Sequence, residues 1–111
     1  MKHLIAIAIL ATSLAANAQF KDGNKLYGQI TSTDVNDKII ALGYVTGVVD
    51  LAYGTLICPP ANSTATQMVD MVKKFLTDNP DMRHHVGSDI VVGVLGTPWP
   101  CAKQKKKGVE L

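Results

Sequence analysis

The N-terminal segment limits what the rest of this chain can fold into. Lys2 is followed by an apolar run over residues 4–16, which is interrupted only by Thr12 and Ser13, and the small-x-small triplet Ala16-Asn17-Ala18 comes next. This order is typical of a secretory signal peptide, which is removed on export. The run is short for an uncleaved membrane anchor. We therefore expect a signal peptide over residues 1–18 and a folded domain that begins at Gln19.

Export determines the chemical state of the two cysteines, Cys58 and Cys101. Disulfides persist outside the cytoplasm, and two cysteines in such a compartment most simply pair with each other. The bond would close a long loop, for which the chain-entropy model gives roughly 4 kcal/mol of stabilisation. We therefore predict one disulfide within a domain that spans residues 19–101.

Composition and charge exclude several classes of protein. The chain is 47% hydrophobic and 18% charged, which is ordinary for a globular protein and too apolar for a disordered one. Its formal charge of +2 is small, and its basic residues are not interleaved with aromatic ones, so no nucleic-acid partner is expected. Four lysines lie in residues 102–111. This basic tail is either simply solvated or attracted to an anionic partner.

The most apolar part of the mature chain is predicted to be a central, mostly buried core helix over residues 39–58. Asp50 is the only charged residue in that stretch, which is nearly long enough to cross a membrane. An aspartate at mid-span costs about 2.5–3.5 kcal/mol on insertion scales, so we expect no stable membrane insertion. Asp50 is either exposed or buried against a partner such as Arg83. Apolar residues recur here at helical spacing: Val35, Ile39, Leu42, Val45, Val49 and Ala52.

Two glycines in the same segment, Gly43 and Gly47, lie four residues apart and therefore on one helix face. Glycines at this spacing let a second backbone come close. We accordingly predict a tight helix crossing at this point of a small bundle.

Capping signals predict two further helices. Thr64 and Gln67 form a capping-box pattern, which starts a helix after the loop at residues 58–63. Its inward face is expected to carry Met68, Met71, Val72, Phe75 and Leu76, and Asp70 and Lys74 are expected to pair on the other face.

The second of these helices is predicted to begin after Asn79, with Asn79 as its N-cap and Pro80 as its first residue. It is expected to run to about Leu95. Its inward residues should be Met82, Val86, Ile90 and Leu95. With a short helix over residues 24–30, the prediction is an all-α, single-domain bundle of four to five helices with one disulfide.

The sequence shows no catalytic equipment. It contains no glycine-rich phosphate loop, and none of the HExxH, GxSxG or CxxC spacings. His84 and His85 are adjacent, so on a helix they would point about 100° apart, which is poor geometry for joint metal binding. We therefore predict a protein that is not an enzyme, with no catalytic residue, metal or cofactor.

The order of several short motifs resembles the Rap/Tai family of immunity proteins, which neutralise peptidoglycan amidases delivered by type VI secretion systems. The resemblance extends over most of residues 23–101, and its motifs stand here as Gly43-Tyr44, Gly47, Asp50, Cys58-Pro59, Thr64, Gln67, Asp70, Leu76, Asn79-Pro80, Arg83-His84 and Pro100-Cys101. It implies an all-α fold, a periplasmic location and frequent dimerisation. It also implies that the motif residues mainly keep the fold: Gly43, Tyr44, Gly47, Asp50, Thr64, Gln67, Pro80, Arg83 and His84.

The resemblance implies an inhibitor of an amidase effector as the function. Residues that contact the effector are expected on polar loops, and our candidates are Asn62, Ser63, Asp78, Asn79 and Asp81. The alternative function is a small periplasmic helical chaperone or acid-stress protein. That alternative would depend on His84 and His85 as its pH-sensitive groups.

Overall fold

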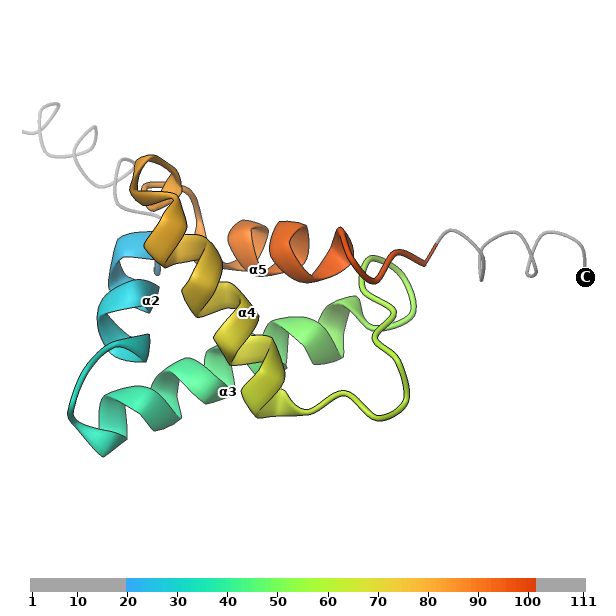
Figure 1. The fold of residues 1–111 in the computed structure, drawn as a ribbon, viewed down its shortest axis with the longest axis horizontal. Coiled ribbons are helices and arrows are strands. Elements are labelled where there is room, and N and C mark those ends of the chain that lie inside the picture. Colours follow the sequence, from blue (N-terminus) through green and yellow to red (C-terminus); the bar gives the residue numbers. More distant parts are fainter. Residues whose placement is uncertain (1–19, 102–111) are drawn as a thin grey trace, which may run out of the picture.

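The computed structural model describes residues 20–101, so the predicted signal peptide and basic tail lie outside the described residues. The domain consists of four α-helices and one short 3-10 helix, arranged as shown in Figure 1. The predicted all-α bundle is confirmed, and the described residues contain only two isolated β-bridges outside the helices. The elements are α2 (Gly23–Ile30), α3 (Val35–Ala52), α4 (Ala65–Asp78), η1 (Pro80–Met82) and α5 (Gly87–Gly96).

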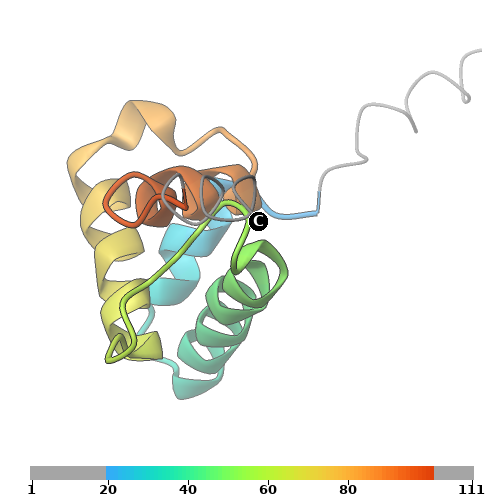
Figure 2. The ribbon, with the colours of Figure 1, turned by 90° about the vertical axis from the view of Figure 1, so that its right-hand side faces the viewer.

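One apolar core holds the four helices together, and every pair of helices is in contact. In Figure 2, α3 and α4 form opposite flanks of the bundle, and α5 lies between them in its upper half. Among residues 20–101 no polar or charged residue is fully buried. The largest fully buried side chains come from all four helices and the loop after α3: Leu26, Val45, Ile57, Val72, Leu76, Val91 and Leu95.

The helix α4 forms as its sequence predicts. The Gln67 amide donates to the Thr64 hydroxyl (3.1 Å) and the Gln67 side chain accepts from the Thr64 amide (3.5 Å), which completes the capping box. Met68, Val72 and Leu76 are buried, and Met71 and Phe75 pack against the core. The predicted pairing of Asp70 with Lys74 is wrong, because Lys74 bridges to Asp78 instead, at 2.9 Å.

The helix α3 is confirmed, but only its second half buries the predicted residues. Val45, Val49 and Ala52 are buried, whereas Val35 is 65% exposed and Ile39 is 59% exposed. A helix that is apolar on nearly every side carries no polar stripe to fix its rotation against the core. Among the described residues no helix is both long and apolar enough to cross a membrane.

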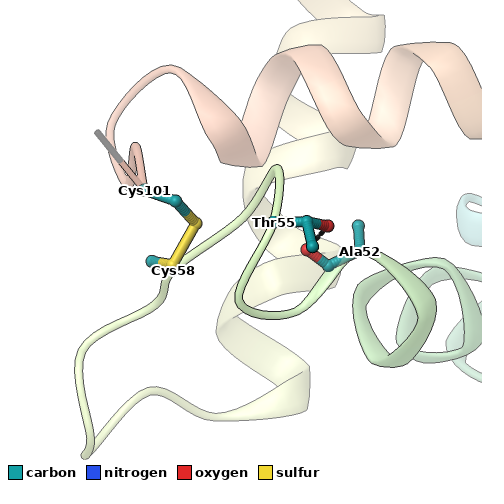
Figure 3. The surroundings of a disulfide bond; sticks show 4 residues. All are labelled: Ala52, Thr55, Cys58 and Cys101. Atoms are coloured by element: carbon teal, nitrogen blue, oxygen red, sulfur yellow. Dashed lines mark hydrogen bonds between the residues drawn. A yellow bond between two sulfur atoms is a disulfide. The ribbon is translucent and has the colours of Figure 1, made fainter. Parts of the chain in front are cut away.

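The predicted close crossing at Gly43 and Gly47 is wrong. A Cβ atom added at either glycine would meet nothing within 4 Å, since both face outward from α3. The helix also ends earlier than predicted, at Ala52. Two residues later Gly54 adopts a left-handed backbone conformation (φ 81°), which turns the chain away from the helix axis. Figure 3 shows the turn that follows, in which the Thr55 hydroxyl donates to the Ala52 carbonyl.

The single helix predicted from Pro80 to Leu95 is also wrong, because it is broken into η1 and α5. The Arg83 carbonyl accepts from the Asn24 amide (2.8 Å) and the His85 carbonyl accepts from the Gly23 amide (2.9 Å). These carbonyls are therefore used by the start of α2 and not by a continuing helix. As a result Met82 and Val86 stay partly exposed, whereas Ile90 and Leu95 are buried as predicted.

The predicted disulfide joins Cys58, in the loop after α3, to Cys101, in the segment after α5 (Figure 3). The Cα atoms are 5.2 Å apart, and the Cys58 amide donates to the Trp99 carbonyl at 2.8 Å. The bond therefore ties the long loop before α4 to the end of the described chain.

Candidate partner-binding site

The two loops that sequence reasoning assigned to partner binding lie at opposite ends of α4. Asn62 and Ser63 precede the helix, and Asp78, Asn79 and Asp81 are at its end or just beyond it. The helix has 14 residues, so the two loops are separated by about 21 Å along its axis. Figure 1 shows the loop before α4 and the turn after it on different sides of the bundle. The structure therefore offers two separate candidate surfaces.

The loop before α4 is held by its own hydrogen bonds. The Ser63 amide and hydroxyl both donate to the Pro60 carbonyl, at 3.0 and 2.7 Å, while Asn62 is exposed. Ser63 borders a shallow groove of about 270 Å³ that also includes the exposed residues Asp50 and Tyr53. Asp50 thus lies on the surface and is not buried against a partner.

The last residue of α4 and the turn that follows it present two carboxylates to solvent, and we call this segment, residues 78–81, the turn after α4. Asp78 and Asp81 are exposed, and Asp78 is bridged to Lys74. Asn79 is half-buried, and its amide group and backbone N–H both donate to the Phe75 carbonyl at 2.9 Å. Asn79 therefore caps the end of α4, and the prediction that its side chain caps the following helix is wrong. The two acidic side chains are therefore carried on a backbone that is hydrogen-bonded to the end of α4.

Arg83 fastens this turn to the bundle. Its Nε donates to the Leu76 carbonyl at 2.7 Å, and its guanidinium lies 3.9 Å from the centroid of the Tyr27 ring. Carbonyls in the last turn of a helix lack intrahelical partners and favour a nearby cation. Arg83 thus joins the end of α4 to α2 and does not pair with Asp50.

Beside the turn lies a large apolar groove that sequence reasoning missed. Its volume is about 530 Å³, and the residues of α4, η1 and α5 that line it meet only in the folded bundle. The one feature of the sequence that pointed to this groove is that α5 is apolar on nearly all sides. The bundle cannot bury all of these sides, so part of the apolar surface of α5 stays exposed. We call this hollow the α4–α5 groove, and it is lined by Phe75, Met82, His85, Asp89, Ile90, Gly93, Val94, Thr97 and Pro98.

Tyr44 belongs to a structural contact rather than to either groove. Lys21 places its ammonium 4.6 Å from the centroid of the Tyr44 ring, and a Cβ atom at Gly87 would lie 2.9 Å from the Tyr44 hydroxyl. Burial, with a smaller contribution from the charge of Lys25, lowers the pKa of Lys21. Tyr44 therefore packs where α3 meets the starts of α2 and α5.

The adjacent histidines lie in the segment between η1 and α5, not on a helix. His84 and His85 are both exposed, with ring centroids 4.2 Å apart. The prediction that they point apart on a helix is wrong, because the backbone there pairs with residues 23–24. Within the described range no group of three or more His, Cys, Asp or Glu residues is placed to hold a metal ion.

Comparison with known proteins places the chain in a family. No curated protein matches it. The family model of the Rap1a immunity proteins matches residues 22–101, which includes all four helices and both cysteines. Because this match covers most of the sequence, the chain belongs to the Rap1a immunity protein family.

Proposed function

We propose that this protein is a periplasmic immunity protein that binds and inhibits a peptidoglycan amidase effector of a type VI secretion system, and that it has no hydrolytic activity of its own. The observation that carries the proposal is the family match over residues 22–101. The N-terminal segment, with its apolar run and its Ala16-Asn17-Ala18 triplet, supports export to the periplasm.

In the proposed mechanism, the turn after α4 covers the active-site cleft of the amidase. Asp78 and Asp81 protrude from a turn whose backbone is fixed by Asn79 and Arg83. A rigid protrusion loses little conformational entropy on binding, which favours affinity. A complex of standard size would bury about 1,600 Å² in total.

We also propose a homodimer, which the family resemblance implies, and the outer face of α3 is its best-supported surface. Ile40 is 50% exposed and Leu51 is 88% exposed, and the open positions Gly43 and Gly47 lie between them. Sedimentation velocity tests this proposal, since Gly47→Glu should shift a dimer toward monomer. A wild-type protein that sediments as a monomer at all concentrations would contradict it.

The alternative, an acid-responsive chaperone, has less support. That function needs groups whose protonation opens a buried apolar surface. His84 and His85 are already exposed, and no charged residue is buried within residues 20–101.

Co-expression in the periplasm tests the immunity function directly. Cells that export a candidate amidase effector, chosen from any amidase gene found next to the gene for this chain, should lyse, and export of this protein should protect them. The purified protein should also inhibit that amidase on isolated peptidoglycan. Lysis at the same rate with and without this protein, and no inhibition in vitro, would contradict the proposal.

A further inference from the structure

We propose that the α4–α5 groove is a docking site for a bulky apolar side chain of the effector, flanked in that effector by lysine or arginine. This inference rests on the proposed immunity function and names the chemistry of the partner's surface. In this contact a side chain of the effector enters this protein, whereas in the proposed mechanism the turn after α4 covers the cleft of the effector.

The size and lining of the groove suit an apolar side chain. Its volume of about 530 Å³ lies within the range of about 300–1,000 Å³ that is usual for ligand sites. Phe75, Met82 and Val94 are apolar residues of the lining, and each keeps part of its surface exposed. An aromatic side chain buries about 150–250 Å² when it is enclosed in such a site.

The charges around the groove favour a basic neighbour for that apolar side chain. Asp89 is part of the lining, and the exposed Asp81 belongs to η1, whose last residue, Met82, also lines the groove. The one arginine of the sequence, Arg83, is not part of the lining, and its guanidinium is engaged with the Tyr27 ring and the Leu76 carbonyl. The remaining polar side chains of the lining are His85 and Thr97, so the carboxylate of Asp89, together with that of the neighbouring Asp81, favours a cationic partner.

The position of the groove suits the same partner as the turn after α4. Met82 links the groove to the turn that carries Asp78 and Asp81. No residue of α3 lines the groove, so dimerisation through the outer face of α3 would leave it accessible. One effector can therefore contact the turn and the groove together.

Gly93 makes the proposal testable without disturbing the core. It lines the groove in the middle of α5, and a Cβ atom there would meet nothing within 4 Å. Gly93→Leu should fill the groove, and leucine is a better helix former than glycine. Gly28→Leu is the matched control, because Gly28 is an equally open helical glycine in α2, outside the groove.

The first experiment uses short peptides as probes and follows the backbone amides of the mature protein by NMR. The peptide acetyl-Lys-Trp-Lys-amide should shift the amides of Asp89, Gly93 and Val94 in a saturable way. It should bind about fivefold tighter than acetyl-Glu-Trp-Glu-amide, which corresponds to exposed charge pairs of roughly 1 kcal/mol in sum. Gly93→Leu should abolish these shifts and Gly28→Leu should keep them. Shifts elsewhere only, no saturation, equal binding of the acidic peptide, or unchanged binding by Gly93→Leu would overturn the proposal.

The second experiment measures inhibition of the amidase by the same variants. Loss of a central binding residue at an interface weakens binding by about thirtyfold or more, so Gly93→Leu should need at least that much more protein for half-inhibition. Gly28→Leu should inhibit like the wild type. Equal inhibition by Gly93→Leu would overturn the groove as the docking site. If the wild type itself does not inhibit, the immunity function fails, and the peptide experiment still decides whether the groove binds an apolar side chain flanked by basic residues.

Discussion

The two ends of α4 are built in different ways. At the start, Thr64 and Gln67 satisfy each other within one turn, and the preceding loop is tied down by the disulfide between Cys58 and Cys101. At the end, Asn79 caps a carbonyl locally, but Arg83 reaches back seven residues to Leu76 while it lies over the ring of Tyr27 in α2. The start thus depends on neighbours in sequence and one covalent bond, and the end depends on a contact with another helix.

This difference has a consequence for the candidate surfaces. The loop at the start borders a small groove of mixed polarity, whereas the turn at the end borders the large α4–α5 groove. Only the turn after α4 has exposed carboxylates next to an apolar groove. Protein–protein interfaces are commonly built in this way, with an apolar centre that carries most of the binding energy and a polar rim around it. The end of α4 is therefore the stronger candidate for effector binding.

The largest effect is expected from removal of the disulfide. The double variant Cys58→Ala, Cys101→Ala should lose about 2–5 kcal/mol in the free energy of unfolding, because the unfolded chain gains freedom. Urea denaturation followed by circular dichroism measures this loss. Reductant should destabilise the wild type by a similar amount and leave the variant unchanged. Coincident unfolding curves of variant and wild type would show that the start of α4 does not need the bond.

A smaller loss is expected when the end of α4 is released from α2. Arg83→Met removes a charge-assisted hydrogen bond and the ring contact, so the free energy of unfolding should fall by about 2 kcal/mol. Urea denaturation measures this loss of stability, and Lys73→Met, which removes an exposed charge from α4, is the control. Equal effects of the two variants would show that the Arg83 contacts contribute nothing specific.

The cap at the start of α4 should contribute less. Thr64→Ala leaves the Gln67 amide without its hydroxyl acceptor and should cost about 1 kcal/mol. Thr64→Ser keeps the acceptor and should unfold within a few tenths of a kcal/mol of the wild type. Thermal denaturation compares the two variants. A serine variant as unstable as the alanine variant would assign the effect to the lost methyl group and not to the cap.

The smallest effects on stability are expected at the two loop tips, where binding is the informative measurement. Asp78→Lys removes an exposed ion pair and should change the free energy of unfolding by less than about 1 kcal/mol. It should also slow association with the proposed amidase effector by about fivefold, since charges at an interface rim act mainly on the association rate. Asn62→Lys, at the other tip, should leave association unchanged in surface plasmon resonance. If Asn62→Lys slowed association and Asp78→Lys did not, the effector would bind at the loop before α4 and not at the turn after it.

The sequence alone determined the features that rest on local chemistry. The capping box at Thr64 and the buried stripe of Met68, Val72 and Leu76 follow from hydrogen bonds and periodicity within one helix. The pairing of the two cysteines followed from their number and from the expected compartment. The family was also visible in the order of short motifs, and the match over residues 22–101 agrees with it.

The tertiary structure decided where local rules gave no unique answer. The sequence did not predict which face of α3 is buried, because the helix is apolar on nearly every side. Contacts with the other helices decide which of its residues face the core. The break between η1 and α5 arises because residues 23–24 take the carbonyls of Arg83 and His85. The α4–α5 groove exists only because three separate elements converge, and a hollow between elements leaves no periodic signal in any one of them.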